Sequence, residues 1–219
     1  DRMAGVEGGV CDIVANQGAG STIISPIAST YLRSGANLDN NSAPMASRKV
    51  VNSPDTEATV VATLSGLLNP SSQISEQYVT GRMYDALGFI WMKDQTTLVH
   101  TNGTLAQGSA TVAGAGQTGL NLTVAALAGS LNAGDIITIA GVKQVNRITK
   151  ATTGKLRQFV VTADVAPGAV SIPIYPAIVP GVGGNAVQYQ TVDVSPANGA
   201  AVNPAMGLAA SAEYTKNFS

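Results

Sequence analysis

Short segments in which every second residue is apolar dominate the second half of the chain. A period of two predicts β-strands with one buried face. Gly, Pro and Asn separate these segments at short intervals, which is typical of a small all-β barrel or sandwich. The alternating apolar positions are Ile137 and Ile139, Phe159 and Val161, Val170, Ile172 and Ile174, and Val187 and Tyr189.

Helical spacing and helix-start signals are found in the first hundred residues instead. Apolar residues at helical spacing within 1–17 predict the end of a helix. The Ser-Pro dipeptides at 25–26 and 53–54 each place a cap before a proline at the first helical position, and predict two more helices. The apolar segments 48–52 and 86–95 predict strands. The first hundred residues therefore have mixed α/β signals, with the aromatic residues of the second strand in the core.

The chain carries few charges for its size. Only 11% of its 219 residues are charged, the mean hydropathy is +0.19, and the net charge is −1. Long-range attraction to nucleic acid or to anionic lipid is therefore not expected. No apolar run is long enough to cross a bilayer, so we expect no membrane partner. Low charge density predicts surface that is buried against other copies of the chain.

Residues that commonly perform catalysis or bind metals are scarce. Hydrolytic triads and metal sites rely on histidine, and His100 is the single one. Cys11 is the single cysteine, so neither a disulfide nor a zinc cluster is expected. The 13 acidic residues are scattered. We therefore expect no enzyme activity, no catalytic or metal-binding residue and no cofactor. The sequence leaves open whether two carboxylates that are distant in sequence come together in the folded chain.

One short motif matches a nucleotide-binding pattern. The segment GAGQTG places Gly114, Gly116 and Gly119 in the G-x-G-x-x-G spacing. That fingerprint requires a preceding strand and a following helix. Here Gly129 and Gly134 interrupt the residues that follow, so a long helix is not expected. The motif is predicted to be a glycine-rich loop, and a nucleotide-binding enzyme is kept as an alternative.

Two alternating strands flank a basic connector between Gly134 and Val165. The connector contains five of the chain's 12 basic residues and no acid. It is open to two interpretations, a solvated hairpin loop or a contact in which these cations meet carboxylates of a neighbouring subunit. Nucleic-acid binding would require more charge and interleaved aromatic residues. The five residues are Lys143, Arg147, Lys150, Lys155 and Arg157.

Four segments in family order resemble the major capsid (coat) proteins of tailed bacteriophages. The similarity is to the branch typified by the short-tailed Salmonella phages, whose coat protein has an inserted β-barrel domain, and it covers most of residues 21–215. The segments are APMASRKVVNSP, LSGLLNPSSQISEQYVTGRMYDALGFIWMKDQTTLVHT, LNAGDIITIAGVKQVNRITKATTGKLRQFVVTADV and YQTVDVSPANGAAV.

This resemblance implies an α+β chain with an HK-97-type capsid axial domain and an inserted all-β barrel. Residues 1–17 are expected to be the end of the spine helix, and 18–97 with 211–219 the axial domain. Residues 98–210 are expected to be the inserted barrel. The amino-terminal arm, most of the spine helix and the carboxy-terminal part have no counterpart here, so we expect a piece of a longer coat protein.

The resemblance also implies a structural function without catalysis. Copies of the chain are expected to form hexamers and pentamers that self-assemble into an icosahedral shell. Scaffolding and portal proteins are possible partners, and DNA is packaged without sequence-specific binding. The expected location is the virion capsid, assembled in the bacterial cytoplasm. In such relatives the long hairpin reaches a neighbouring subunit, which favours intersubunit contacts for the five basic residues. A phage decoration or surface-adhesion β module is the alternative function.

Overall fold

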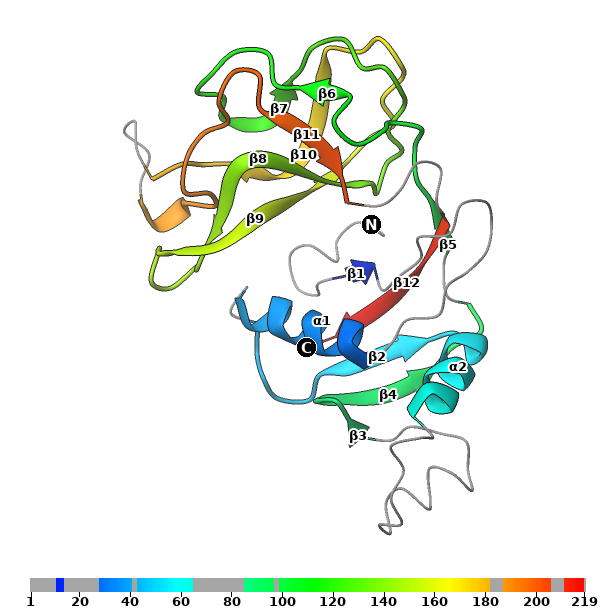
Figure 1. Cartoon of the computed structure of the whole chain (residues 1–219). Helices are drawn as coiled ribbons and strands as arrows, with labels where there is room; N and C mark the ends of the chain where they lie inside the picture. The colour runs from blue at the N-terminus through cyan, green and yellow to red at the C-terminus, as the bar shows by residue number, and fades with distance from the viewer. Residues whose placement is uncertain are drawn as a thin grey trace. The chain divides into compact units, whose positions relative to one another are not determined.

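The computed structural model describes residues 11–13, 28–40, 43–64, 85–96, 99–181, 187–205 and 211–218. These residues are mostly β-sheet with few helices (Figure 1). They form two compact units. The first lies within Thr22–His100 together with the strands at 11–13 and 211–218, and the second lies within Thr101–Ala210. The predicted α+β class fits only loosely, because the described α-helices belong to the first unit alone.

The first unit contains a sheet with the strand order β1-β12-β2-β4-β3, and β5 also pairs with β12. Strands β2 and β4 are parallel, whereas β1 pairs with β12, β12 with β2 and β3 with β4 in antiparallel fashion. The elements are β1 (Cys11–Ile13), α1 (Ala28–Asn40), β2 (Lys49–Asn52), α2 (Pro54–Leu64), β3 (Asp85–Ala86), β4 (Phe89–Lys93), β5 (Val99–Thr101) and β12 (Ser211–Phe218).

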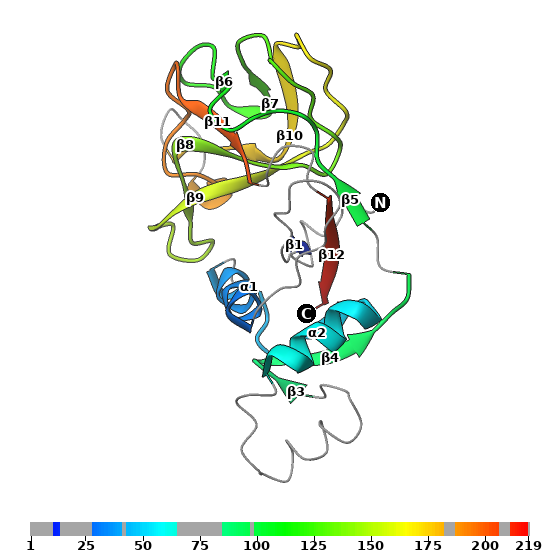
Figure 2. The same cartoon turned by 45° about the vertical axis from the view of Figure 1, so that its right-hand side comes forward.

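Both helices pack against this sheet and form the core of the first unit (Figure 2). Val50 of β2 and Trp91 of β4 are register partners, and both are buried. The Trp91 ring lies 4.6 Å from that of Tyr31 in α1, and its Nε1 donates to the Ala86 carbonyl at 2.8 Å. The predicted core position of the aromatic strand is confirmed. The cluster comprises Tyr31, Leu38, Val50, Val60, Phe89 and Trp91.

Local signals account for the elements around residue 50. Strand β2 and helix α2 confirm the predictions for 48–52 and for a helix after the second Ser-Pro. The Ser53 hydroxyl caps α2, because it accepts the Thr56 N–H at 3.2 Å. The first Ser-Pro lies outside the described residues.

The helix predicted for 1–17 is wrong at its three described positions. Cys11–Ile13 is strand β1, and Cys11 pairs with Lys216 of β12. Two physical reasons explain the difference. Gly8 and Gly9 weaken a helix, and a strand partner about 200 residues away in sequence supplies backbone hydrogen bonds that local spacing cannot reveal. The rest of 1–17 lies outside the described residues.

The second unit contains a six-stranded sheet that closes on itself. The strand order is β6-β11-β8-β9-β10-β7, with antiparallel neighbours. Its two ends meet where the Ala113 N–H donates to the Thr123 carbonyl and the Ala125 N–H donates to the Thr111 carbonyl. The sheet is therefore a barrel. The strands are β6 (Ala110–Thr111), β7 (Gly119–Thr123), β8 (Ile136–Val145), β9 (Thr152–Val161), β10 (Ser171–Ile178) and β11 (Ala201–Pro204).

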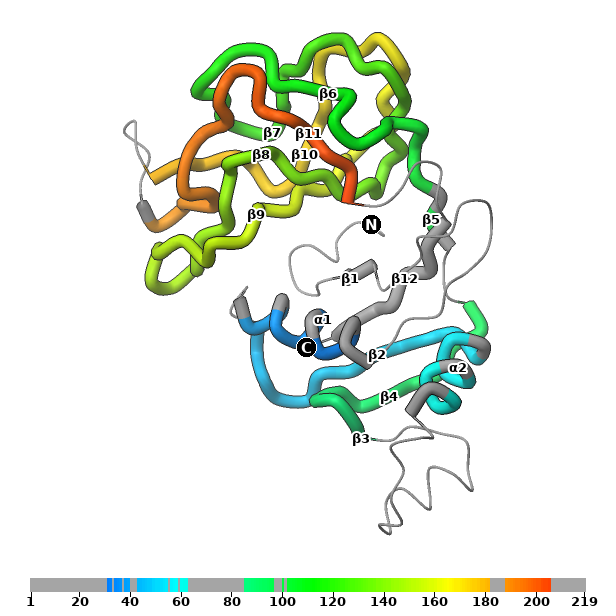
Figure 3. The backbone as a smooth tube through the Cα atoms, in the orientation of Figure 1, coloured from blue at the N-terminus to red at the C-terminus, as the bar shows by residue number. Residues whose placement is uncertain are grey.

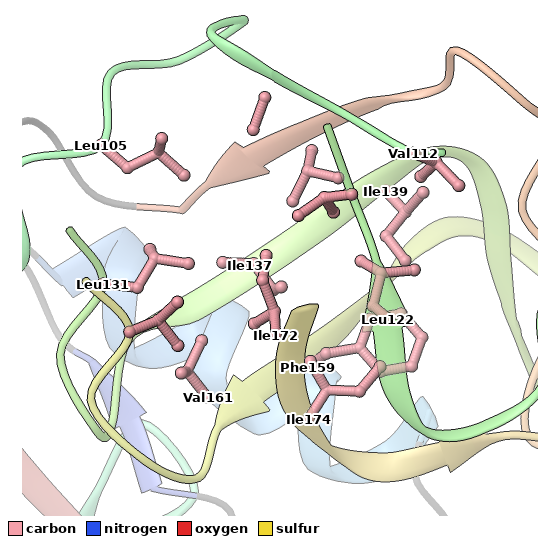
Figure 4. Close-up of a cluster of buried hydrophobic side chains, with 14 of the residues drawn as sticks. Leu105, Val112, Leu122, Leu131, Ile137, Ile139, Phe159, Val161, Ile172 and Ile174 are labelled. Atoms are coloured by element: carbon pink, nitrogen blue, oxygen red, sulfur yellow. The ribbon is translucent and has the colours of Figure 1, made fainter. Parts of the chain in front are cut away.

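Alternating residues of these strands fill the barrel (Figure 4). Ile137 and Ile139 of β8, Phe159 of β9 and Ile172 and Ile174 of β10 are all buried, with polar or smaller residues between them. Side chains that alternate along a strand occupy opposite faces, so one face of each strand builds the core. The predicted period of two is confirmed for these strands.

The alternation predicted at Val187 and Tyr189 does not form a strand. Val187–Tyr189 is a short 3-10 helix, η3, and Tyr189 is 69% exposed. Two apolar positions are too few to distinguish a strand from one helical turn. The segment after η3 is held by isolated bonds, of which one joins the Thr191 N–H to the Val179 carbonyl. Val170, the residue before β10, is also exposed, unlike Ile172 and Ile174.

Candidate intersubunit contact site

The hairpin of β8 and β9 extends beyond the sheet of the barrel (Figure 3). Strand β8 pairs with β11 only at Ile137–Ile139, and β9 pairs with β10 only at Val160–Val161. The outer halves of the two strands instead pair with each other, from Lys143 and Leu156 to Val145 and Thr152. The predicted basic connector occupies this outer part.

Asn146 shapes the turn of the hairpin. Its side-chain oxygen accepts the N–H groups of Ile148 and Thr149 at 2.8 and 3.0 Å. Its backbone N–H donates to Ala151, and its carbonyl accepts the Lys150 N–H. An asparagine side chain that bonds its own following backbone is a frequent turn-forming device. The turn therefore holds Arg147, Ile148 and Thr149 at the exposed end of the hairpin.

The five predicted contact residues occupy different environments. The side chains of Lys143, Arg147 and Lys155 are exposed, and none of these three forms an ion pair among the described residues. Lys150 is half-buried, and its Nζ donates to the Gln188 carbonyl at 2.8 Å. The hairpin thus brings the exposed cations to one end of the barrel, whereas Lys150 joins the hairpin to η3.

Arg157 differs from the other four because it is only 8% exposed. Its pKa is lowered from the ordinary value of an arginine to about 10, chiefly because burial removes water from the guanidinium. The charge of Arg147 acts in the same direction, and Tyr175 acts in the opposite one. The guanidinium remains charged at neutral pH. Its burial leaves it little surface for a direct contact with a neighbour.

A second segment supports the hairpin and was missed by sequence reasoning. Asp193 Oδ1 accepts the Lys143 N–H at 2.7 Å, and the Asp193 N–H donates to the Lys143 carbonyl at 3.0 Å. Gln144 forms a bridge with Val192. The sequence signal was weak, since Asp193 is a lone acid about 50 residues from its partner. The site is therefore built from the hairpin, η3 and the residues that follow η3.

The other candidates from the sequence lie on other elements of the chain. His100 is half-buried in β5, and Cys11 lies in β1. Across the described ranges, no group of three His, Cys, Asp or Glu side chains is placed to hold a metal ion. No described helix is both long and apolar enough to span a bilayer. The GAGQTG segment is a loop followed by strand β7, where a dinucleotide-binding fold has a helix.

Comparison with known proteins gives a family and one related structure. Residues 91–213 match the family described as P22 coat protein, gene protein 5. Among solved structures, the CUS-3 coat protein I-domain is 30% identical, with 45% of this chain and 96% of that chain covered and a TM-score of 0.35. A search of curated proteins gave no match.

The family match covers more than half of the chain, from β4 to β12. The chain therefore belongs to the P22 coat protein family, and it is a structural protein of a phage capsid. This confirms the resemblance to phage coat proteins noted in the sequence. The family is structural and not enzymatic, and its place is the virion.

Proposed function

We propose that this chain is part of a major capsid protein that self-assembles into an icosahedral shell around phage DNA. The observation that carries the proposal is the family match over residues 91–213. The shell is built from hexamers and pentamers of the protein, with scaffolding and portal proteins as further partners. DNA is enclosed without sequence-specific contacts, in keeping with the low charge of the chain, and assembly takes place in the bacterial cytoplasm.

We assign the two units to the two domains expected of such a protein. The axial domain of HK-97 type comprises residues 18–97 and 211–219, and the inserted barrel comprises 98–210. The pairing of β5 with β12 supports this assignment, because these strands lie where the chain leaves and re-enters the first unit.

The hairpin of β8 and β9 is the proposed contact with a neighbouring subunit. Its outer half projects beyond the sheet of the barrel, and Lys143, Arg147 and Lys155 are exposed on it. Each such contact is weak in water, but a closed shell repeats it many times. Lys150 and Arg157 contribute by supporting the hairpin from within.

Electron microscopy of the protein expressed with its native flanking sequence tests the proposal. Closed shells of uniform diameter are expected. Arg147→Glu reverses one exposed charge and should lower the yield of shells, because the introduced carboxylate repels the carboxylates that the arginine would meet. The control is the double substitution Ala126→Glu and Ala128→Glu, which changes the net charge equally at exposed positions outside the hairpin.

The possible results separate the parts of the proposal. Normal shells from Arg147→Glu would reject the hairpin contact but leave the capsid function in place. A folded monomer under every assembly condition would reject self-assembly and favour the decoration module instead. An equal loss of shells in the control would show that net charge, and not the hairpin, controls the yield.

A further inference from the structure

Several large apolar side chains are exposed around the hairpin. Ile148 is 80% exposed in the turn, and Tyr189 is 69% exposed in η3. Apolar groups of this size at the surface are informative when they gather in one place. We call the set Ile148, Leu156, Tyr189 and Val194 the hairpin patch.

A hydrogen bond joins the two segments that carry Ile148 and Tyr189, the most exposed members of the hairpin patch. The Lys150 Nζ donates to the Gln188 carbonyl at 2.8 Å. Ile148 lies two residues before Lys150, and Tyr189 is the neighbour of Gln188. The turn between β8 and β9 and the short helix η3 also lie side by side in both ribbon views (Figures 1 and 2). The ammonium of Lys150 therefore joins the turn to η3, the two segments that carry Ile148 and Tyr189.

The segments that carry the other two members, Leu156 and Val194, are linked through the backbone of Lys143. Leu156 is the register partner of Lys143, so their side chains share one face of the hairpin. Asp193 bonds the Lys143 backbone and also accepts the Val194 N–H at 2.8 Å. The hairpin patch is thus a surface built by three segments that are bonded to one another.

Exposed cations neighbour two members of the hairpin patch, Ile148 and Leu156. Arg147 precedes Ile148, and Lys155 precedes Leu156. Lys143 is the register partner of Leu156, and all three cations are exposed. Apolar side chains with a charged rim are the usual composition of a protein–protein interface. The partner that fits has an apolar surface flanked by carboxylates.

The chain itself has the complementary charge. The segment 101–210 contains five basic and three acidic residues, whereas the rest of the chain contains seven basic and ten acidic residues. The barrel unit is therefore positive and the first unit is negative. This asymmetry favours contact between the hairpin of one copy and the first unit of another over contact between two barrels.

We propose that the hairpin patch is an apolar anchor that docks on the first unit of a second copy of this chain. Ile148 and Tyr189 supply most of the affinity, the cations select the acidic partner, and Lys150 is a positioning residue that keeps η3 beside the turn. The proposal deepens the proposed function and rests on it, but it assigns the contact energy to side chains other than the cations.

Self-association of the full chain, measured by sedimentation velocity, tests the anchor. Ile148→Ser and Tyr189→Ser should each raise the dissociation constant about tenfold or more, as expected for central interface residues. The matched control is Val170→Ser, which removes a side chain that is 58% exposed on the same barrel away from the hairpin. The control should change the dissociation constant by less than about twofold.

A photoreactive residue placed at position 148 identifies the partner surface. Cross-links to residues within 22–100 of a second copy are expected. Cross-links to the barrel of a second copy would overturn the assignment of the first unit as the partner. A wild-type chain that stays monomeric at every concentration would overturn the whole inference.

Lys150→Met tests the positioning role, since it keeps the aliphatic stem and removes the ammonium. Amide hydrogen exchange at 187–189 of the free chain should become faster, and association should weaken. Unchanged exchange would reject the role of Lys150. If Arg147→Glu lowers the yield of shells while Ile148→Ser behaves like Val170→Ser, the proposed capsid contact stands and the apolar anchor fails.

Discussion

Gly103 lies where two backbone segments of the barrel unit approach closely. A Cβ atom at this position would lie 2.2 Å from the Ser130 carbonyl oxygen and 2.7 Å from Leu131 Cα. The Gly103 N–H also donates to the buried Asp135 Oδ2 at 3.0 Å, and Asp135 accepts the Asn132 N–H as well. Because glycine has no side chain, Gly103 allows the first residues of the barrel unit to pack closely against the segment around Ser130.

Gly103→Ala should destabilise the barrel by about 3 kcal/mol, because backbone atoms cannot move aside as a flexible side chain can. Urea unfolding followed by far-ultraviolet circular dichroism measures this loss. Gly35→Ala in α1 is the contrasting variant. Its Cβ would meet Phe89 at 3.6 Å, an ordinary contact, so the first unit should gain roughly 0.5 to 1 kcal/mol from helix propensity. A harmless Gly103→Ala would contradict the close approach.

Arg157 makes the stability of the barrel depend on pH in the alkaline range. Its pKa is about 10 in the folded chain and has the higher, ordinary value of an arginine when the chain is unfolded, so above about pH 10 the unfolded state binds more protons. Stability from this group therefore rises with pH. Between pH 9.5 and 11, the stability of the wild type relative to Arg157→Gln should rise by about 1 kcal/mol. Parallel urea curves for both proteins give the difference, and a constant difference would contradict the lowered pKa.

At the scale of elements, one side chain joins the two ends of the barrel sheet. Gln117 Nε2 donates to the carbonyls of Ala113 and Thr123 at 2.7 and 2.9 Å. Its Oε1 accepts the Thr123 N–H at 2.6 Å. Because β6 and β7 are short, this amide supplies a large share of the bonds that close the barrel. The GAGQTG segment thus has a structural explanation in the closure of the sheet.

Gln117→Ala should lower the free energy of unfolding of the barrel by about 1 kcal/mol, since it removes exposed side-chain hydrogen bonds between the two ends that water replaces only in part. Thermal unfolding followed by circular dichroism measures the change. Gln158→Ala is the control, because that glutamine is exposed on β9 and should change stability by less than about 0.5 kcal/mol. Equal effects of the two substitutions would refute the role of Gln117 in closure.

At the scale of the whole molecule, the chain builds two separate cores. One cluster contains Phe89, Trp91 and their neighbours, and the other contains the barrel residues around Ile137 and Phe159. The two clusters share no residue. Each unit therefore has its own apolar core, as expected of a domain that folds by itself.

Residues 101–205 expressed alone should fold into a stable barrel, because their core is complete without the first unit. In the whole chain, Trp91 is the single tryptophan and lies in the first unit, so its fluorescence reports only that unit. Urea unfolding by fluorescence and by circular dichroism should give different midpoints. Coincident transitions, with an unfolded isolated barrel, would show that the units fold as one.

Much of the local structure was predictable because it depends on neighbouring residues. Alternation placed Ile137 and Ile172 on the inner face of the barrel, and the Ser-Pro pair placed the start of α2. Five cations close together in sequence predicted a basic hairpin, because a two-strand ladder keeps sequence neighbours close in space. The family could be inferred from long segments in the right order.

The sequence by itself therefore determined the alternating strands of the barrel, the start of α2, the basic hairpin and the family. Only the tertiary structure decided that β1 is a strand, because its partner β12 is about 200 residues away. It also decided that Arg157 is buried while Arg147 is exposed, and that Asp193 and Gln188 brace the hairpin. These features depend on which distant segments meet, and periodicity carries no information about contacts between distant segments.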